Sequence, residues 1–309
     1  MGVDGIRRLE ETEAATVRAL VGALVETGCV DPVPTAVPLG AGLLVVSGAR
    51  RYVNRAVGVT LNELGPDDVA TVVRHYTDAG LPAAVQLSSW APATTVAALG
   101  AAGFVPASCR SMLAVDPRAP MAAARAAPGD SRLEIVEVGD DPTRSADAAD
   151  VMAAEILAAG ADRTVSDEFM AADRAASGTS QLLALLAGRP VGCGSLSVVD
   201  AGGVLTGWLG AAATIPSARG RGVQTALVRH RLRLAVDAGC DLVAATASVG
   251  STSSRVLRRC GFRLVHEQWV VQRFAATGQA AWTTTREPAT VAPPPSFRST
   301  SGSRKMKTP

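Results

Sequence analysis

The chain has 309 residues, of which 48% are hydrophobic, and a formal net charge of +2 at pH 7. This composition is typical of a globular protein with enough apolar material for a core, and the length favours two domains. No apolar run approaches the roughly 20 residues of a membrane-spanning helix, and the first residues lack the apolar core of a signal peptide. We therefore expect a cytoplasmic location, with no nucleic acid or membrane as partner and with oligomer formation left open.

Cysteine and histidine are sparse. The five cysteines are scattered without a C-x-x-C pair, and only three histidines occur. This distribution predicts reduced, mostly buried thiols and argues against a zinc site or a disulfide framework. We expect no bound metal.

The hydrophobic pattern of the first half predicts three helices and four strands. The expected helices span 7–28, 67–78 (capped by Asp67 and Asp68) and 94–102, and the expected strands span 42–47, 53–61, 83–87 and 111–115. Residues 116–130 are rich in Pro, Ala and Arg. We place a linker at 119–130, between a first domain at 1–118 and a second at 131–280.

The second half is predicted to begin with a strand at 132–138 and helices at 146–158 and 168–176. Strands follow at 181–187, 191–199 and 207–214, then a helix from Val223, a strand at 242–247, a short helix at 253–259 and a final pair of strands within 263–273. The chain is Thr/Pro/Ser-rich from 283 onward, and we expect a disordered basic tail at 281–309.

The two halves repeat one plan. Val-Arg-His occurs at 73–75 and 228–230, Ala-Gly at 79–80 and 238–239, and Gly-Phe at 103–104 and 261–262. Because the order of predicted elements around these tripeptides and dipeptides also agrees, we interpret the halves as two copies of one supersecondary unit.

The stretch 208–227 carries the clearest functional signal. Pro216 ends a strand because it lacks an N–H for the ladder, and Arg219-Gly220-Arg221-Gly222 forms a turn before the helix that starts at Val223. Free backbone N–H groups at such a helix start bind phosphate or pyrophosphate. There is no G-K-S or G-K-T of a Walker site, and a dinucleotide fingerprint would need a third glycine at Ala226. A plain glycine-rich connection is the alternative.

Two blocks carry a family resemblance: 215–224 (I-P-S-A-R-G-R-G-V-Q), close to an R/Q-x-x-G-x-G/A signature, and 250–262, which ends in the Gly-Phe corner. With the order of elements, they resemble the GNAT superfamily of acyl-CoA N-acyltransferases. The whole chain is similar to tandem-domain GNAT proteins whose N-terminal copy is degenerate. The resemblance implies an α+β fold of two GNAT-like domains, each a mixed central sheet flanked by helices.

The resemblance also implies acetyl-CoA as co-substrate, with its pantetheine arm along the strand before the turn and its pyrophosphate at the turn. The implied contact residues are Ala212, Ala213, Thr214, Arg219, Gly220, Arg221, Gly222, Val223, Gln224, Thr225 and Ser253. Gln224 departs from the usual Gly or Ala, and a longer side chain is tolerable at this position if it points outward. Many members have a tyrosine where this chain has Leu257, and its only tyrosines, Tyr52 and Tyr76, lie in the first half. The catalytic acid and base are therefore unknown.

Other polar residues have structural interpretations. His230 is expected in the core, with a catalytic role as the alternative. His266 and Glu267 are expected to face solvent, and for them the alternative is a base at the acceptor cleft. Ser251 and Ser253 are expected to cap the short helix, with a place near the thioester as the alternative for both. The expected helix face with Asp162, Asp167 and Glu168 is predicted to be solvated, although it could attract an amine.

In the first half, the acidic segment 62–68 replaces the glycine turn, and its carboxylates are expected to repel a pyrophosphate. The predicted function is transfer of an acetyl group from acetyl-CoA to an amine on a small molecule. The alternatives are a non-catalytic acyl-CoA-binding sensor or scaffold and a protein N-acetyltransferase.

Overall fold

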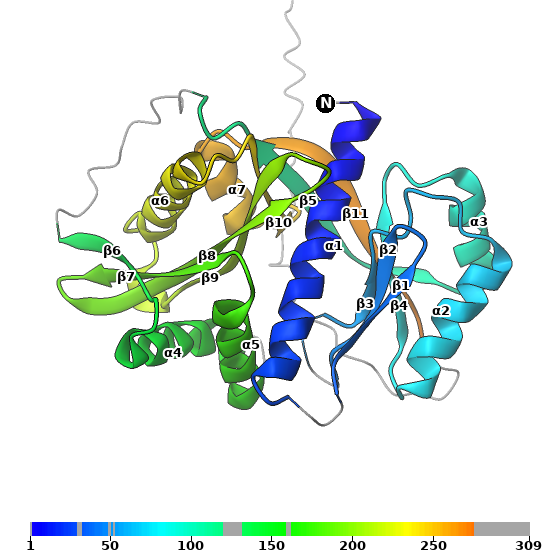
Figure 1. The fold of residues 1–309 in the computed structure, drawn as a ribbon, viewed down its shortest axis with the longest axis horizontal. Coiled ribbons are helices and arrows are strands. Elements are labelled where there is room, and N and C mark those ends of the chain that lie inside the picture. The colour runs from blue at the N-terminus through cyan, green and yellow to red at the C-terminus, as the bar shows by residue number, and fades with distance from the viewer. Residues whose placement is uncertain are drawn as a thin grey trace, which may run out of the picture.

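The computed structural model describes residues 2–29, 33–48, 51, 53–119, 132–158 and 162–274. One mixed sheet of eleven strands runs through the molecule, and helices cover both of its faces (Figure 1). This arrangement confirms the predicted α+β class with a mixed sheet flanked by helices. No helix of the described residues is long and apolar enough to cross a membrane.

Each half contributes a run of helices and strands. The first half consists of α1 (Val3–Glu26), β1 (Thr35–Leu39), β2 (Gly42–Val46), β3 (Arg55–Val57), α2 (Pro66–Asp78), β4 (Ala83–Ser88), α3 (Ala93–Ala101) and β5 (Val105–Val115). The second half consists of β6 (Leu133–Glu137), α4 (Pro142–Ala158), α5 (Arg163–Ala175), β7 (Thr179–Leu186), β8 (Arg189–Asp200), β9 (Leu205–Thr214), a 3₁₀ turn (Pro216–Ala218), α6 (Val223–Asp237), β10 (Leu242–Ser248), α7 (Thr252–Arg259) and β11 (Arg263–Arg273).

Two strand predictions were wrong. β1 forms where no strand was expected, and residues 263–273 form one continuous strand instead of two. No Gly, Pro or Asn interrupts 264–272, so nothing favours a turn there. The one long strand pairs with β5 along one side and with β4 along the other, and its register against β5 shifts after Leu264 and after Val270. The predicted linker lies outside the described residues except for Ala119, and the predicted tail lies outside them entirely.

The two halves exchange their last strands. The order of the sheet is β1-β2-β3-β4-β11-β5-β10-β9-β8-β7-β6. Strand β5 of the first half therefore lies between β10 and β11, and β11 of the second half lies between β5 and β4. Each half completes its part of the sheet with a strand from the other.

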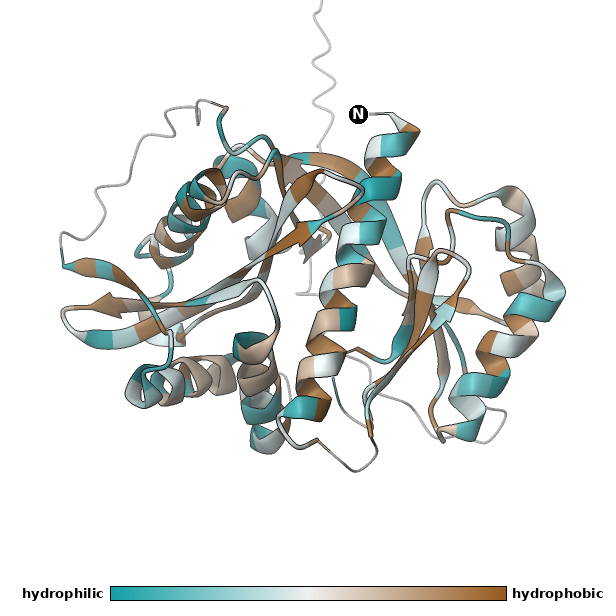
Figure 2. Ribbon diagram, viewed as in Figure 1, coloured by the Kyte–Doolittle hydropathy of each residue, from teal (hydrophilic) through white to brown (hydrophobic). Residues whose placement is uncertain are grey.

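Helix α1 joins the halves across the centre of the sheet (Figure 1). Apolar and polar residues alternate along its length (Figure 2). Leu9 packs with Met112, Trp208 and Ala244, which come from β5, β9 and β10. Near the other end of α1, Ala23 and Leu24 pack against α5 of the second half. The core that α1 covers is thus shared by both halves.

We predict that Leu113→Ala lowers the free energy of unfolding of the whole chain by about 2–5 kcal/mol, because it leaves a cavity in a packed core. Leu113 lies on β5 of the first half and is fully buried in the core cluster of the second half with Val243 and Leu257. Urea unfolding followed by tryptophan fluorescence would measure the loss. Val105→Ala, at an exposed position of the same strand, is the control and should cost less than about 0.5 kcal/mol. Two separate unfolding transitions, with only one shifted, would contradict the shared core.

Candidate active site

Strands β9 and β10 are neighbours that pair over only three residues. Residues 242–244 of β10 lie parallel to residues 206–208 of β9. Beyond this point β10 stays paired with β5 but not with β9. In β9 the register against β8 shifts between Gly210 and Ala213, and Ala211 has a φ of 43°. The strands diverge, and Ala212 is exposed in the middle of the sheet.

The glycine turn at 219–222 follows the part of β9 that diverges from β10. Gly220 and Gly222 have φ angles of 78° and 81°, and a Cβ at either position would meet no atom within 4 Å. Gly222 is the N-cap of α6, so no side chain caps the N–H groups of the first turn. These groups and the helix dipole make this position attractive to an anion.

A cleft with a volume of about 630 Å³ extends from this turn between β9 and α7. Every predicted contact residue except Arg221 lines it: Ala212, Ala213, Thr214, Arg219, Gly220, Gly222, Val223, Gln224, Thr225 and Ser253. Further cations line it from the two helices, Arg229 on α6 and Arg259 on α7. Arg219 donates a hydrogen bond to the Glu155 carboxylate of α4 at the edge of the cleft.

The side chain of Gln224 does not point outward, which was the condition set for a long side chain at this position; it is held by internal hydrogen bonds instead. Its Nε2 donates hydrogen bonds to the carbonyl oxygen of Ala213 at 2.6 Å and to Oγ1 of Thr214 at 2.9 Å. A Gly or Ala could not make these bonds. Gln224 therefore ties the start of α6 to the end of β9.

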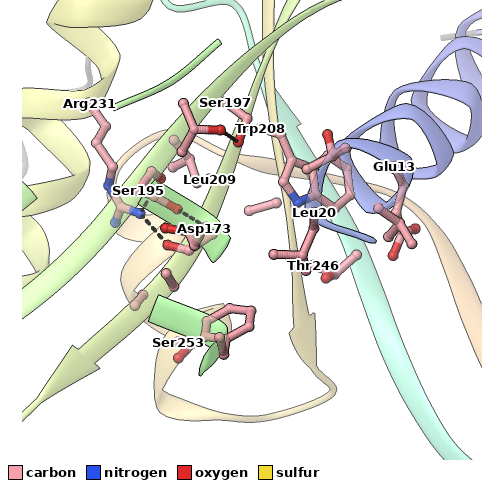
Figure 3. A pocket seen from close by; sticks show the side chains of 18 of the residues that line it. Glu13, Leu20, Asp173, Ser195, Ser197, Trp208, Leu209, Arg231, Thr246 and Ser253 are labelled. Atoms are coloured by element: carbon pink, nitrogen blue, oxygen red, sulfur yellow. Dashed lines mark hydrogen bonds between the residues drawn. The ribbon is translucent and has the colours of Figure 1, made fainter. Parts of the chain in front are cut away.

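A second cavity, of about 380 Å³, adjoins the cleft. Ala212, Gln224 and Ser253 line both spaces. The walls of the cavity come from both halves, with α1 on one side and α5, β8 and β9 on the other. Figure 3 shows Glu13 and Leu20 on the first side and Asp173, Ser195 and Arg231 on the second.

Asp173 of α5 is a buried carboxylate in the wall of this cavity. Its Oδ2 accepts a hydrogen bond from Nε2 of Gln181 at 2.9 Å, and its Oδ1 accepts one from Oγ of Ser195 at 3.1 Å. Burial raises the pKa of Asp173 to about 6, although these two hydrogen bonds and the charge of Arg231 act in the opposite direction. A carboxylate with this pKa is a stronger base than an ordinary aspartate.

Arg231 of α6 is a fully buried guanidinium behind β9. It donates hydrogen bonds to the carbonyl oxygens of Leu227, Ser195 and Gly210 at 3.2, 3.1 and 3.2 Å. Burial lowers the pKa of Arg231 to about 10, so it stays charged at neutral pH. A Cβ at position 194 would lie 2.9 Å from its Nη1, which explains why Gly194 occupies that position.

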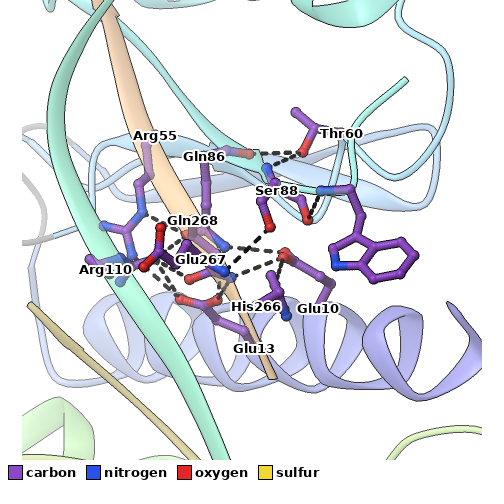
Figure 4. Close-up of polar contacts among 12 residues, drawn as sticks. Glu10, Glu13, Arg55, Thr60, Gln86, Ser88, Arg110, His266, Glu267 and Gln268 are labelled. Carbon is purple, nitrogen blue, oxygen red and sulfur yellow. Dashed lines mark hydrogen bonds and ion pairs between the residues drawn. The ribbon is translucent and has the colours of Figure 1, made fainter. Parts of the chain in front are cut away.

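A network of buried polar side chains lies on the α1 side of the cavity (Figure 4). The Glu13 carboxylate accepts hydrogen bonds from Nη2 of Arg110 at 3.0 Å and from the amides of Gln86 and Gln268 at 2.8 Å each. Burial raises the pKa of Glu13, but Arg110, Arg55 and the two amides together bring it below its ordinary value. Glu13 is therefore a fully engaged anion.

His266 belongs to this network, which corrects the expectation that it faces solvent. Its Nε2 lies 2.7 Å from Oε1 of Glu10, and both side chains are buried under α1. The prediction placed it on the wrong face because it assumed two short strands at 263–273. The one strand that forms, β11, presents His266 and Gln268 to α1.

Within the described residues, the first half has no opening between the two strands that correspond to β9 and β10. By the order of elements, β3 and β4 match β9 and β10. Oγ1 of Thr60 donates a hydrogen bond to the carbonyl oxygen of Gln86 at 3.1 Å and accepts one from the N–H of Ser88 at 2.9 Å. These bonds join the chain after β3 to β4 and fill the space that is open in the second half.

At the start of α2, Oδ2 of Asp68 accepts a hydrogen bond from the N–H of Gly65 at 3.0 Å. Gly65, and not Asp67 or Asp68, is the N-cap, which corrects the predicted cap. The carboxylate of Asp68 nevertheless occupies the helix start, as the acidic composition of 62–68 suggested.

The sequence of the second half matches a known family of proteins. Residues 151–262 match the sequence profile of the acetyltransferase (GNAT) family. These residues form a GNAT domain. They include the diverging strands, the glycine turn and α7, so the resemblance first seen in two sequence blocks is confirmed.

Solved structures are similar to nearly the whole chain. A GCN5-related N-acetyltransferase from Kribbella flavida has 16% identity and a TM-score of 0.56 and covers 84% of this chain and 96% of its own. A tandem GNAT protein from the clavulanic acid biosynthesis pathway has 15% identity and a TM-score of 0.53, with 85% and 95% covered. A conserved protein of unknown function from Staphylococcus epidermidis has 11% identity and a TM-score of 0.51, with 71% and 84% covered. No curated protein matches the chain. The chain has the tandem GNAT fold.

Several predicted residues of the GNAT domain lie away from the cavity. Oδ1 of Asp162 accepts a hydrogen bond from the N–H of Thr164 at the start of α5, and Asp167 pairs with Arg163 in solvent. Glu168 is half-buried in an ion pair with Arg51 of the first half at 2.8 Å, so the prediction of a solvated face holds for Asp162 and Asp167 but not for Glu168. His230 is half-buried beside Arg233 and is not a core residue, because it lies at the side of α6.

The serines of α7 have different roles. Oγ of Ser251 accepts a hydrogen bond from the N–H of Ser254 at 3.1 Å and caps the helix as expected. Ser253 lies within α7 and does not cap it; it lines both the cleft and the cavity.

The position of the family tyrosine is apolar. Leu257 lines the cavity with an aliphatic side chain. Tyr76 is buried in the first-half core, where its hydroxyl accepts a hydrogen bond from the N–H of Val45 at 3.1 Å, and burial raises its pKa. Tyr52 lies outside the described residues. Asp173 and Arg231, the charged pair of the cavity, were not predicted from the sequence.

We predict that Asp173→Asn changes the pH dependence of stability. The pKa of Asp173 rises from an ordinary 3.8 to about 6 on folding, so the folded state binds the proton more tightly and stability falls as pH rises from about 4 to about 6. Between pH 4 and pH 7 the wild-type chain should lose roughly 2–3 kcal/mol more than Asp173→Asn, because one pKa unit corresponds to 1.36 kcal/mol. Urea unfolding at both pH values measures this difference. Equal losses in the two proteins would show that the carboxyl titrates normally.

Proposed function

We propose that the protein is an N-acetyltransferase that moves the acetyl group of acetyl-CoA to an amine on a small molecule. The observation that carries this proposal is the junction of the cleft and the cavity at Ala212, Gln224 and Ser253. A donor in the cleft and an acceptor in the cavity would meet there. Positioning of two reactants can supply about 7–11 kcal/mol of the barrier of such a reaction.

The donor would use the features of the cleft in sequence. The pyrophosphate would bind the free N–H groups at 220–225, with Arg219 and Arg221 adding positive charge. The pantetheine arm would follow β9 at 212–214, where this strand is no longer paired with β10. The thioester would then reach the bulge at Ala211, beside the cavity.

The acceptor would occupy the cavity between α1 and α5. Because this space is walled by helices and strands of both halves, it suits a small molecule better than a lysine on a folded protein. We keep the predicted division of the chain, with residues 131–280 binding CoA and residues 1–118 as the degenerate copy, but the copy would contribute one wall of the acceptor site.

The identity of Leu257 favours a second candidate, an acyl-CoA-binding sensor without turnover. Its apolar side chain cannot protonate a leaving thiolate. A CoA thiolate has a thiol-like pKa of about 8.5, however, and can leave with water as proton source. Release of free CoA thiol from acetyl-CoA in the presence of an amine, absent without the amine, would separate the enzyme from the sensor.

We predict that Gly222→Asp abolishes acetyl-CoA binding, because the new carboxylate would occupy the N–H groups of the α6 start. Gly202→Asp is the matched control. Gly202 also has a positive φ, 67°, and open space around its Cβ, but it lies in the turn between β8 and β9. Titration calorimetry should show binding to Gly202→Asp only. Equal affinities of the two variants would exclude the glycine turn as the pyrophosphate site.

We predict one acetyl-CoA per chain, because Thr60 closes the space between β3 and β4 and Asp68 occupies the start of α2. The stoichiometry in the same titration checks this prediction. Two equivalents would show that the first half binds CoA as well.

A further inference from the structure

We infer that the acceptor is a primary amine on an apolar body, bound with its nitrogen at Asp173, whose carboxylate takes up the amine proton during acyl transfer. This inference rests on the proposed function and names the acceptor class and the base.

The cavity has a mainly apolar wall. Its larger apolar side chains are Val17, Leu20, Val53, Met152, Val165, Phe169, Trp208, Leu209, Val228, Val256 and Leu257. Small-molecule sites range from about 300 to 1,000 Å³, so a cavity of about 380 Å³ suits a compact ligand. A sugar or a polyamine would lose hydrogen bonds to water in such a space and could replace them only at the polar side chains of the wall, such as Thr16, Thr246 and Ser253. The walls therefore favour an aliphatic or aromatic body.

The charged side chains of the cavity differ in the ion pairs and hydrogen bonds that they make. On the α1 side, Glu13 is engaged by Arg110, Arg55 and two amides. On the opposite side, the guanidinium of Arg231 is held by three carbonyl oxygens.

Asp173 accepts hydrogen bonds only from the neutral side chains of Gln181 and Ser195 among the described contacts. No Arg or His nitrogen of the described residues lies within 4.0 Å of its carboxylate. Its remaining lone pairs are thus available to an ammonium or amine nitrogen. Asp173 is the carboxylate of the cavity that can accept a ligand.

Asp173 also lies where the proposed path of acetyl-CoA along β9 ends, near Ala211. A Cβ at position 210 would be 4.0 Å from Oδ1 of Asp173 and 3.1 Å from Oγ of Ser195. Gly210 directly precedes the bulge at Ala211, after which the edge of β9 is free. An acyl group that reaches this bulge would lie beside the carboxylate. Glycine at 210 leaves the approach open.

The chemical step is balanced by two proton transfers. The neutral amine attacks the thioester carbon, so that the N–C bond forms and the C–S bond breaks. The nitrogen becomes cationic and strongly acidic in the adduct, and Asp173 accepts its proton. The thiolate of CoA leaves and gains a proton through solvent, since its pKa of about 8.5 exceeds that of the carboxyl. The products are the amide and free CoA, and the carboxylate is regenerated.

A purely structural role must be distinguished, since Asp173 also balances the buried charge of Arg231. The groups that face Asp173 are Gln181 of β7, Cys193 and Ser195 of β8 and Arg231 of α6, with Glu13, Arg55 and Arg110 across the cavity. If Asp173 is only a counterion, its replacement changes the free energy of unfolding but not the pH dependence of the rate. If Asp173 is a base, the rate depends on one further protonation, which steepens the pH profile of kcat/KM.

The first experiment compares acceptors by release of free CoA from acetyl-CoA. We expect kcat/KM for 2-phenylethylamine to exceed that for glucosamine at least about tenfold, which is the usual discrimination of an apolar pocket. Leu20→Trp, which fills the α1 side of the cavity, should raise KM for 2-phenylethylamine and leave acetyl-CoA affinity unchanged. Val25→Trp, at an exposed position of α1, is the control. A preference for glucosamine, or no reaction of either amine while acetyl-CoA binds, would overturn the acceptor class.

The second experiment measures log kcat/KM against pH. Its slope should be one while only the amine titrates and two below about pH 6, where Asp173 gains a proton as well. In Asp173→Asn we expect kcat to fall by about 10²–10⁴, the slope to stay at one and acetyl-CoA affinity to be unchanged. Asp173→Glu should restore part of the rate. Wild-type kcat in the Asn variant would overturn the assignment.

Ser195→Ala keeps the test decisive if Asp173→Asn does not fold. Loss of the Ser195 hydrogen bond disfavours the carboxylate, so the change of slope should move to higher pH. Ser197→Ala is the control, because Ser197 bonds to Oγ1 of Thr179 and not to Asp173. An unmoved change of slope in Ser195→Ala would refute the role of Asp173. Failure of the wild-type chain to bind acetyl-CoA would instead refute the proposed function.

Discussion

Beyond Trp208 and Ala244 two adjacent strands of the central sheet stop pairing, and the site depends on this divergence. Parallel neighbours in a buried sheet normally pair along their length, because unpaired buried N–H and C=O groups are costly. Here β10 is held by its antiparallel pairing with β5 from residue 243 to 248, while β9 turns away at the bulge at Ala211. The strand that holds β10 belongs to the other half of the chain. The exchange of β5 and β11 is therefore part of what keeps the cleft open.

The first half has lost the same opening but gained another role. Thr60 links β4 to the chain after β3, and polar side chains fill the space beneath α1. This filling fixes α1 over the sheet, with Glu13 held by charge and hydrogen bonds from four strands. Because α1 then forms one wall of the cavity, the packing of the first half helps to determine the shape of a cavity that both halves line. The two halves are structurally inseparable at this point.

The glycine turn could be predicted from sequence because its signal is local: a proline, two glycines with positive φ and a helix follow one another within eight residues. Asp173 could not be found in this way. It lies in an ordinary amphipathic helix, and its burial depends on Gly210, Gln181, Ser195 and Arg231, which come from four other elements. The exchanged strands were missed for a similar reason, since the alternation of β5 is the same whichever neighbour it has. His266 was misplaced because the continuity of β11 depends on pairing with two partners. Local patterns therefore predicted the glycine turn at the end of the cleft, and tertiary contacts determine the cavity beside it.

A crystal structure of the chain with acetyl-CoA bound tests the account most directly. The account predicts one acetyl-CoA per chain, with the pyrophosphate at the N–H groups of 220–225, the pantetheine arm along β9, and the acetyl carbon beside Gly210 and facing the cavity between α1 and α5. The carboxylate of Asp173 should then lie within hydrogen-bonding distance, directly or through one water, of the position an attacking amine would take. An acetyl group pointing away from that cavity, or CoA bound between β3 and β4, would contradict the account.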